Sequence, residues 1–127
     1  MPSPGVKRAV RVAERVRKEL ALVIATEIRD PRAAGVNVTR VEMTDDLRTA
    51  RVFFSLLTGG DDPKIRSEAE VALAGASGMI RREVSSRVGL RYAPDLRFIF
   101  DNQGDKITAV ERVLAEIRDE EKARNKQ

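Results

Sequence analysis

The chain has 127 residues and a net charge of +4, with 24 basic and 20 acidic side chains and neither cysteine nor histidine. This length suits one domain with its own core, and the missing residue types exclude disulfides, thiolate metal sites and histidine-based catalysis. No apolar run approaches the roughly 20 residues of a membrane span, and no signal-peptide core follows the N-terminus, so we expect a cytoplasmic protein.

The first predicted element is a helix from about Gly5 to Ile28, because apolar residues recur there at spacings of three and four. The apolar stripe comprises Val12, Val16, Leu20, Val23 and Ile28. The dipeptide Asp30-Pro31 ends this helix, since the residue before a proline disfavours the helical region.

Two strands are predicted next, and the short turn between them, Thr44-Asp45-Asp46, makes them an antiparallel hairpin. In the first strand, residues 36–43, the apolar parity switches between Val38 and Val41. This switch predicts either a β-bulge or a strand with both faces partly covered. The second strand, residues 48–57, alternates apolar and polar side chains.

A helix–kink–helix element is predicted from Pro63 to Val88, with Asp62 as its N-cap and Gly89 as its C-cap. Its two apolar runs are separated by Ala76-Ser77-Gly78, where the glycine costs roughly 1 kcal/mol relative to alanine and permits a kink. Such a corner would present backbone amides, and amides at a helix N-terminus attract phosphate.

A third strand, residues 95–101, and a last helix, residues 106–118, complete the pattern. Three strands cannot bury both faces alone, so we expect the helices on one face, which gives an α+β two-layer sandwich. We expect a single domain over residues 1–118 and a polar, disordered tail over residues 119–127.

Positive charge is concentrated in two segments. Residues 1–29 carry seven basic and three acidic side chains, and residues 76–97 carry five basic and two acidic ones. This clustering is typical of an electrostatic footprint on a polyanion, although a solvated, mixed-charge surface would have the same composition. The candidate nucleic-acid contacts are Lys7, Arg8, Arg11, Arg15, Ala76, Ser77, Gly78, Arg81, Arg82, Arg87 and Arg91.

Candidates for catalysis and metal binding are few. Ser77 has no histidine to activate it, so a hydrolase is only a secondary hypothesis. The pairs Asp45-Asp46 and Asp61-Asp62 fall at predicted turns, where aspartate bonds local backbone, and are interpreted as turn and capping residues rather than metal ligands. Among the phenylalanines, Phe53 is the one expected to offer an exposed ring for stacking on nucleic acid.

An ordered set of short segments over about residues 7–115 resembles the ribosome-binding factor A family, small bacterial proteins that assist maturation of the small ribosomal subunit. The set includes Arg11-Val12-Ala13-Glu14-Arg15-Val16, Ile28-Arg29-Asp30-Pro31-Arg32, Ala76-Ser77-Gly78-Met79-Ile80-Arg81 and Leu90-Arg91-Tyr92-Ala93-Pro94-Asp95-Leu96-Arg97-Phe98.

This resemblance implies a fold similar to the type II KH domain, with the order helix, strand, strand, helix–kink–helix, strand. KH domains clamp nucleic acid with a Gly-x-x-Gly loop between two helices, whereas this chain has Ala-x-Gly at that point. The resemblance also implies binding to the small (30S) ribosomal subunit and its 16S rRNA during late maturation, near the 5′ end of that RNA.

The sequence therefore leads us to expect a non-catalytic, monomeric RNA-binding assembly factor. We expect no cofactor, no metal, no membrane association and no small-molecule substrate. The alternative is a protein–protein interaction module without RNA binding, which would use a free sheet edge or the last helix.

Overall fold

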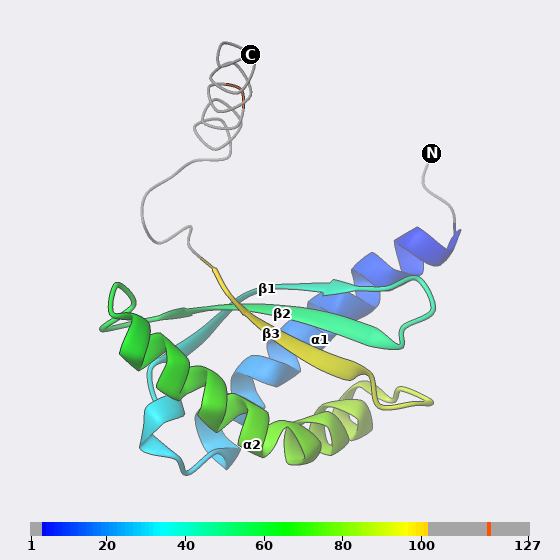
Figure 1. The fold of residues 1–127 in the computed structure, drawn as a ribbon. Coiled ribbons are helices and arrows are strands. Elements are labelled where there is room, and N and C mark those ends of the chain that lie inside the picture. The colour runs from blue at the N-terminus through cyan, green and yellow to red at the C-terminus, as the bar shows by residue number, and fades with distance from the viewer. Residues whose placement is uncertain (1–3, 102–116, 118–127) are drawn as a thin grey trace.

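The structure is a computed structural model, and it describes residues 4–101 and residue 117. Within this part of the chain, two long helices and three strands form the fold (Figure 1). The elements are α1 Pro4–Glu27, the short 3₁₀ helix η1 Pro31–Ala33, β1 Val36–Met43, β2 Thr49–Leu56, α2 Pro63–Val88 and β3 Asp95–Phe100. The predicted last helix and tail lie outside the described residues, apart from Ile117, which is helical.

The described strands form one mixed sheet in the order β1–β2–β3. β1 and β2 are antiparallel, as their short turn predicted, whereas β2 and β3 are parallel. A parallel pair needs a long crossover connection, which α2 provides. The register shifts between Val38 and Arg40, so the parity switch in β1 is a β-bulge, and Val38 and Val41 both join the core.

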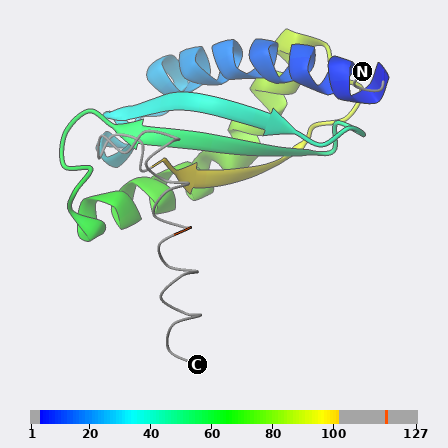
Figure 2. The ribbon, with the colours of Figure 1, turned by 90° about the horizontal axis from the view of Figure 1, so that it is seen from above.

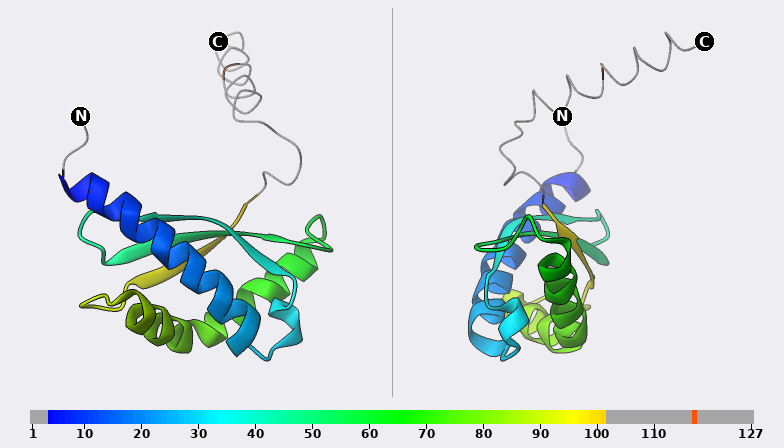
Figure 3. Two further views of the ribbon diagram at one scale, coloured as in Figure 1. Left: turned by 180° about the vertical axis from the view of Figure 1, so that it is seen from behind. Right: turned by 60° about the vertical axis from the view of Figure 1, so that its left-hand side comes forward.

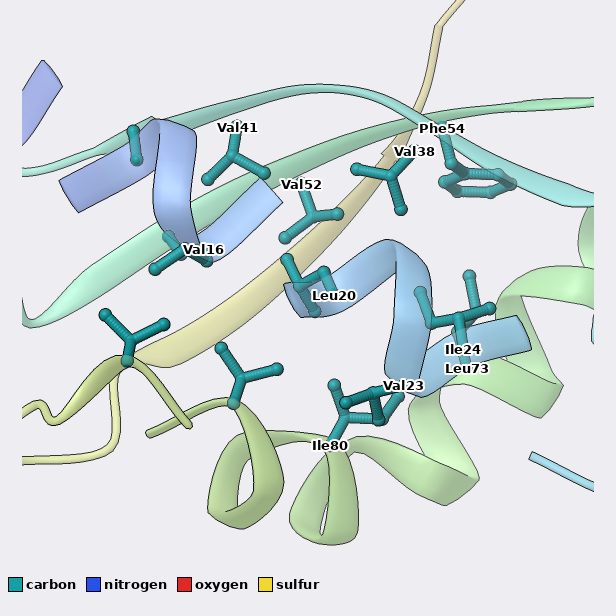
Figure 4. Packing of buried hydrophobic residues seen from close by; sticks show 14 of the residues in the cluster. Val16, Leu20, Val23, Ile24, Val38, Val41, Val52, Phe54, Leu73 and Ile80 are labelled. Atoms are coloured by element: carbon teal, nitrogen blue, oxygen red, sulfur yellow. The ribbon is translucent and has the colours of Figure 1, made fainter. Parts of the chain in front are cut away.

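Both helices cover the same face of the sheet, which confirms the α+β two-layer arrangement (Figure 3). α1 contributes Val16, Leu20 and Val23 to the core, and all three are fully buried. In Figure 4, Leu20 lies between Val52 of β2 and Ile80 of α2. The side chain of Leu20 therefore connects α1 to both the sheet and α2 within the core.

Aromatic and polar contacts tie the end of β3 to the other strands. The ring of Phe100 meets the fully buried ring of Phe54 in an edge-on geometry, with centroids 5.7 Å apart. The next residue, Asp101, is buried, and its carboxylate accepts a hydrogen bond from the hydroxyl of Thr39 (2.8 Å). Because Thr39 occupies the β-bulge, the irregularity in β1 helps to satisfy a buried carboxylate.

The predicted boundaries of the two long helices in the described part of the chain are confirmed to within one residue. The carboxylate of Asp62 caps α2 by accepting a hydrogen bond from the Lys64 amide (2.9 Å). Asp30 caps η1 in the same way and also pairs with the guanidinium of Arg32 (2.7 Å). The side-chain hydrogen bond from Arg32 lowers the pKa of Asp30 to about 2.

α2 is helical without a break from Pro63 to Val88, so Ala76-Ser77-Gly78 lies inside it. The ribbon nevertheless bends in the middle of this helix (Figure 2), as the glycine predicted. The hydroxyl of Ser77 donates to the carbonyl of Ala74 (2.9 Å), a type of bond that favours helix bending. The expectation of free amides at this corner is wrong, because the amides of a continuous helix donate within the helix.

Because Leu20 joins both helices to the sheet, we expect Leu20→Ala to lower the free energy of unfolding by about 2–5 kcal/mol. Leu22, on the same helix, is 52% exposed and provides a matched control. Leu22→Ala is expected to change the free energy of unfolding by no more than about 0.5 kcal/mol. Urea denaturation followed by circular dichroism measures both values, and similar losses in the two variants would contradict this account of the core.

Candidate nucleic-acid interface

Three segments that are distant in the sequence meet at one end of the molecule: the N-terminal half of α1, the β1–β2 turn and the loop after α2 (Figures 1 and 2). They border a hollow of about 480 Å³. Its polar lining consists of Arg8 and Arg15 from α1, Asp46 and Arg48 from the turn, and Arg91 and Tyr92 from the loop. The hollow thus gathers four guanidinium groups against one carboxylate.

The parallel pairing of β2 and β3 brings the loop and the turn together. Thr49, which begins β2, lies in register with Asp95, which begins β3. The backbone amide of Asp95 also donates to the carbonyl of Arg48 (2.8 Å). The loop that follows α2 therefore ends beside the β1–β2 turn.

The backbone at the end of α2 requires a glycine. Gly89 has a φ of +79°, in the left-handed region, and the amides of Gly89 and Leu90 both donate to the carbonyl of Ser85. Glycine adopts this conformation without the steric cost of a side chain. This C-cap ends the helix immediately before Arg91 and Tyr92, which line the hollow.

The β1–β2 turn is held by its own side chains. The carboxylate of Asp46 accepts hydrogen bonds from the hydroxyl of Thr44 (2.7 Å) and from the amide of Arg48 (3.1 Å). The bond from Thr44 is the main reason that the pKa of Asp46 lies below its usual value. Asp45 and Asp46 both lie in the turn, as predicted, and the hydrogen bonds of Asp46 fix the backbone that carries Arg48.

Arg81 serves to position the loop. Its Nε donates to the carbonyl of Pro94 (2.9 Å), and its Nη2 donates to the carbonyl of Ala93 (3.1 Å). These bonds connect α2 to the segment just beyond Tyr92. Arg81 therefore holds the backbone of the loop that carries Arg91 and Tyr92, although its own side chain does not line the hollow.

Arg87 lies in a different environment, among carboxylates. Its guanidinium lies 3.6 Å from Glu19 of α1, 3.8 Å from Glu27 of α1 and 3.6 Å from Glu83 of α2. Three negative charges around one positive charge disfavour a phosphate at this place. The contacts of Arg87 instead join the two helices on the surface.

The residues at the bend of α2 lie outside the hollow. Ser77 borders a groove beside β3, together with Arg51 and Arg97, and Ala76 borders a separate groove between α2 and the α1–η1 segment. Arg82 is exposed, and its Nη1 lies 3.9 Å from the point where a Cβ on Gly78 would be. The structure therefore separates these predicted contacts from Arg8, Arg15 and Arg91.

Lys7 and Arg11 are exposed on α1 and continue the basic surface beyond the rim of the hollow. Lys7, Arg11 and Arg15 follow one another at intervals of four residues, so they share one face of the helix. This arrangement agrees with the prediction that the three side chains lie on a common helix face.

Two residues of the hollow that could contact RNA through a cation or a ring, Arg48 and Tyr92, were not among the predicted contacts. The guanidinium carbons of Arg48 and Arg91 lie 5.1 and 5.4 Å from the centre of the Tyr92 ring. Phe53, which was expected to be the exposed ring, is half-buried and lies under the guanidinium of Arg40 at 4.0 Å. In the sequence, the position of Tyr92 next to the predicted contact Arg91 could have identified this ring. The proximity of Arg48 to the ring could not be predicted in this way, because it depends on the pairing of β2 with β3.

A metal site, an activated serine or a membrane span would indicate another class of function. Residues 4–101 and 117 contain no group of three acidic side chains that could hold a metal ion. The hydroxyl proton of Ser77 is directed at the backbone carbonyl of Ala74 rather than at a general base. In the same part of the chain, neither α1 nor α2 has the length and apolar character needed to cross a membrane.

The fold and the site define a KH-like α+β protein with an arginine-rich end. A family model described as Ribosome-binding factor A matches residues 8–114. The chain is 46% identical over 114 residues to Ribosome-binding factor A of Sorangium cellulosum, covering 90% of this chain and 91% of the relative. It is 44% identical over 113 residues to that of Clostridium perfringens, covering 88% and 96%. The chain belongs to the ribosome-binding factor A family.

Two solved structures are similar to this one. The crystal structure of ribosome-binding factor A from Thermus thermophilus has a TM-score of 0.63 at 22% identity, covering 72% of this chain and 93% of that chain. The solution NMR structure of a Thermotoga maritima protein assigned to ribosome binding factor A has a TM-score of 0.61 at 30% identity, covering 78% and 91%. These structures share the fold described above.

Because Arg81 holds two carbonyl groups of the loop, we expect Arg81→Ala to lower the free energy of unfolding by about 1–3 kcal/mol. The neighbouring Arg82 is exposed and provides the control, since Arg82→Ala should change this free energy by no more than about 0.5 kcal/mol. Thermal and urea denaturation measure the difference. Equal stabilities of the two variants would show that the loop does not depend on Arg81.

Proposed function

We propose that this protein is a non-catalytic ribosome assembly factor. In this proposal it binds the small (30S) ribosomal subunit through its 16S rRNA and aids late maturation and processing of that RNA. The family supports association with the ribosome, since the relatives are named as ribosome-binding factors. The structural observation that carries the proposal is the gathering of Arg8, Arg15, Arg48 and Arg91 around one hollow.

This arrangement suits an RNA backbone for electrostatic reasons. Arginine is charged at all physiological pH values and presents several N–H donors that match phosphate oxygens. Among residues 4–101, none of the four arginines of the hollow forms a salt bridge. Their charges are therefore available to phosphates, and binding should be sensitive to salt.

The mechanism requires no chemical step by the protein. A ligand shifts an RNA between conformations only by as much as its affinity for them differs. The factor would favour one conformation of immature 16S rRNA and would dissociate once the mature shape removes that advantage. We propose that it acts as a cytoplasmic monomer over one domain, residues 1–118, without cofactor, membrane or small-molecule substrate.

A second candidate function is a protein–protein interaction module that does not contact RNA. β3 lies at an edge of the described sheet, beside a groove of about 720 Å³ lined partly by α2. An edge strand offers unpaired backbone groups to a partner strand. Binding of this kind would depend little on the arginines of the hollow or on salt.

We expect the wild-type protein to co-sediment with free small subunits and not with large subunits, with an affinity that falls as salt rises. The double variant Arg8→Gln, Arg15→Gln should bind more weakly, because it removes two positive charges from the hollow. Each lost phosphate contact should reduce the slope of log affinity against log salt by about 0.7–0.9. Sedimentation at several salt concentrations measures both effects.

The double variant Arg29→Gln, Lys64→Gln makes the same change in net charge away from the hollow, since Arg29 follows α1 and Lys64 lies in the first turn of α2. It should keep most of the affinity. Equal losses of affinity in the two double variants would show that binding does not depend on the arginines of the hollow. Failure of the wild-type protein to bind any ribosomal particle would refute the assembly-factor proposal.

A further inference from the structure

Tyr92 is an aromatic residue that the core does not use. It is the only tyrosine of the chain, which has no tryptophan, and it is 55% exposed. All four phenylalanines, by contrast, are buried or half-buried. The most exposed ring of the chain therefore lines the arginine-rich hollow.

The arginines near this ring differ from several other arginines of the fold, which pair with carboxylates. Arg17, Arg32 and Arg40 each pair with a nearby carboxylate, at 2.6, 2.7 and 3.2 Å. In the described part of the chain, Arg48 and Arg91 have no such partner and instead lie close to the Tyr92 ring, at 5.1 and 5.4 Å from its centre. Their planar guanidinium groups and the ring offer stacking surfaces beside positive charge.

We propose that this hollow binds an unpaired nucleotide, a proposal that rests on the RNA-binding function proposed above. The base would stack on Tyr92 or on the guanidinium planes beside it, and its phosphates would contact Arg8 and Arg15, which line the hollow from α1. Aromatic rings and guanidinium planes are the surfaces on which proteins stack single-stranded bases. The hollow, at about 480 Å³, has the size of a small-molecule site.

The geometry favours a single strand over a duplex and over an acidic peptide. In an RNA duplex the bases are stacked on one another, so their faces cannot reach Tyr92. An acidic peptide would satisfy the arginines but would gain nothing from stacking on the ring. A nucleotide uses both features, because it combines a flat base with a phosphate.

The first test compares Tyr92→Leu with the wild-type chain in binding to a hexa-adenylate RNA strand and to an RNA duplex of equal length. We expect the leucine variant to bind the single strand about 5- to 150-fold more weakly, the range for losing one stacked base. Its salt slope should be unchanged, because no charge is removed. Tyr92→Phe, which keeps the ring, should recover the lost affinity.

Val71 provides a matched control, since it is also 55% exposed but lies on α2 in a different groove. Val71→Ala should leave binding of the strand unaltered. Denaturation midpoints of all variants show whether any loss comes from unfolding. The proposal is overturned if Tyr92→Leu binds the strand as the wild-type does, or if a polyglutamate peptide competes as well as the strand.

The second test uses the fluorescence of Tyr92 itself, which is specific to this site because the chain has no other tyrosine and no tryptophan. We expect hexa-adenylate to quench this emission and an abasic ribose-phosphate strand of equal length to leave it unchanged. Quenching by adenosine monophosphate alone would show that the hollow also accepts a free nucleotide. Equal quenching by the abasic strand would overturn the stacking proposal.

The failure of this inference is distinguishable from failure of the assembly-factor proposal. If small subunits bind the wild-type and Tyr92→Leu proteins equally well, with the arginine variants impaired, only the stacking site is wrong. If the wild-type protein binds no ribosomal particle, the proposed function itself is wrong.

Discussion

The parallel pairing of β2 with β3 is the constraint on which the candidate site depends. Because the two strands run in the same direction, the chain must return along the sheet through α2 before β3 begins. The return places Asp95 beside Thr49 and the preceding loop beside the β1–β2 turn. An antiparallel third strand would carry Arg91 and Tyr92 to the other end of the sheet, away from Arg48.

The basic residues perform two different tasks in this fold. One group stabilises the structure: Arg81 holds backbone carbonyls of the loop, and Arg87 pairs with glutamates of both helices. The other group, which includes Arg8, Arg15 and Arg48, lines the hollow and forms no salt bridge among residues 4–101. A count of positive charges does not separate these groups, because the difference lies in what each guanidinium contacts.

Local signals in the sequence were reliable where neighbouring residues decide the outcome. The caps at Asp62 and Gly89 and the bulge in β1 follow from side-chain chemistry, backbone freedom and apolar parity. The kink prediction was correct for the bend of α2 but wrong for its amides, because one glycine weakens a helix without ending it. Phe53 was chosen as the exposed ring because its strand parity excludes it from the core, yet Arg40 covers it.

The sequence by itself determined the order of helices and strands, the α+β class, the family resemblance and the presence of two basic segments. These depend on periodicity, caps and composition, which are properties of adjacent residues. Only the tertiary structure decided that α1, the β1–β2 turn and the loop after α2 form one hollow containing Arg48 and Tyr92. The physical reason is that strand direction and crossover packing set distances between residues far apart in the chain, and no local pattern encodes those distances.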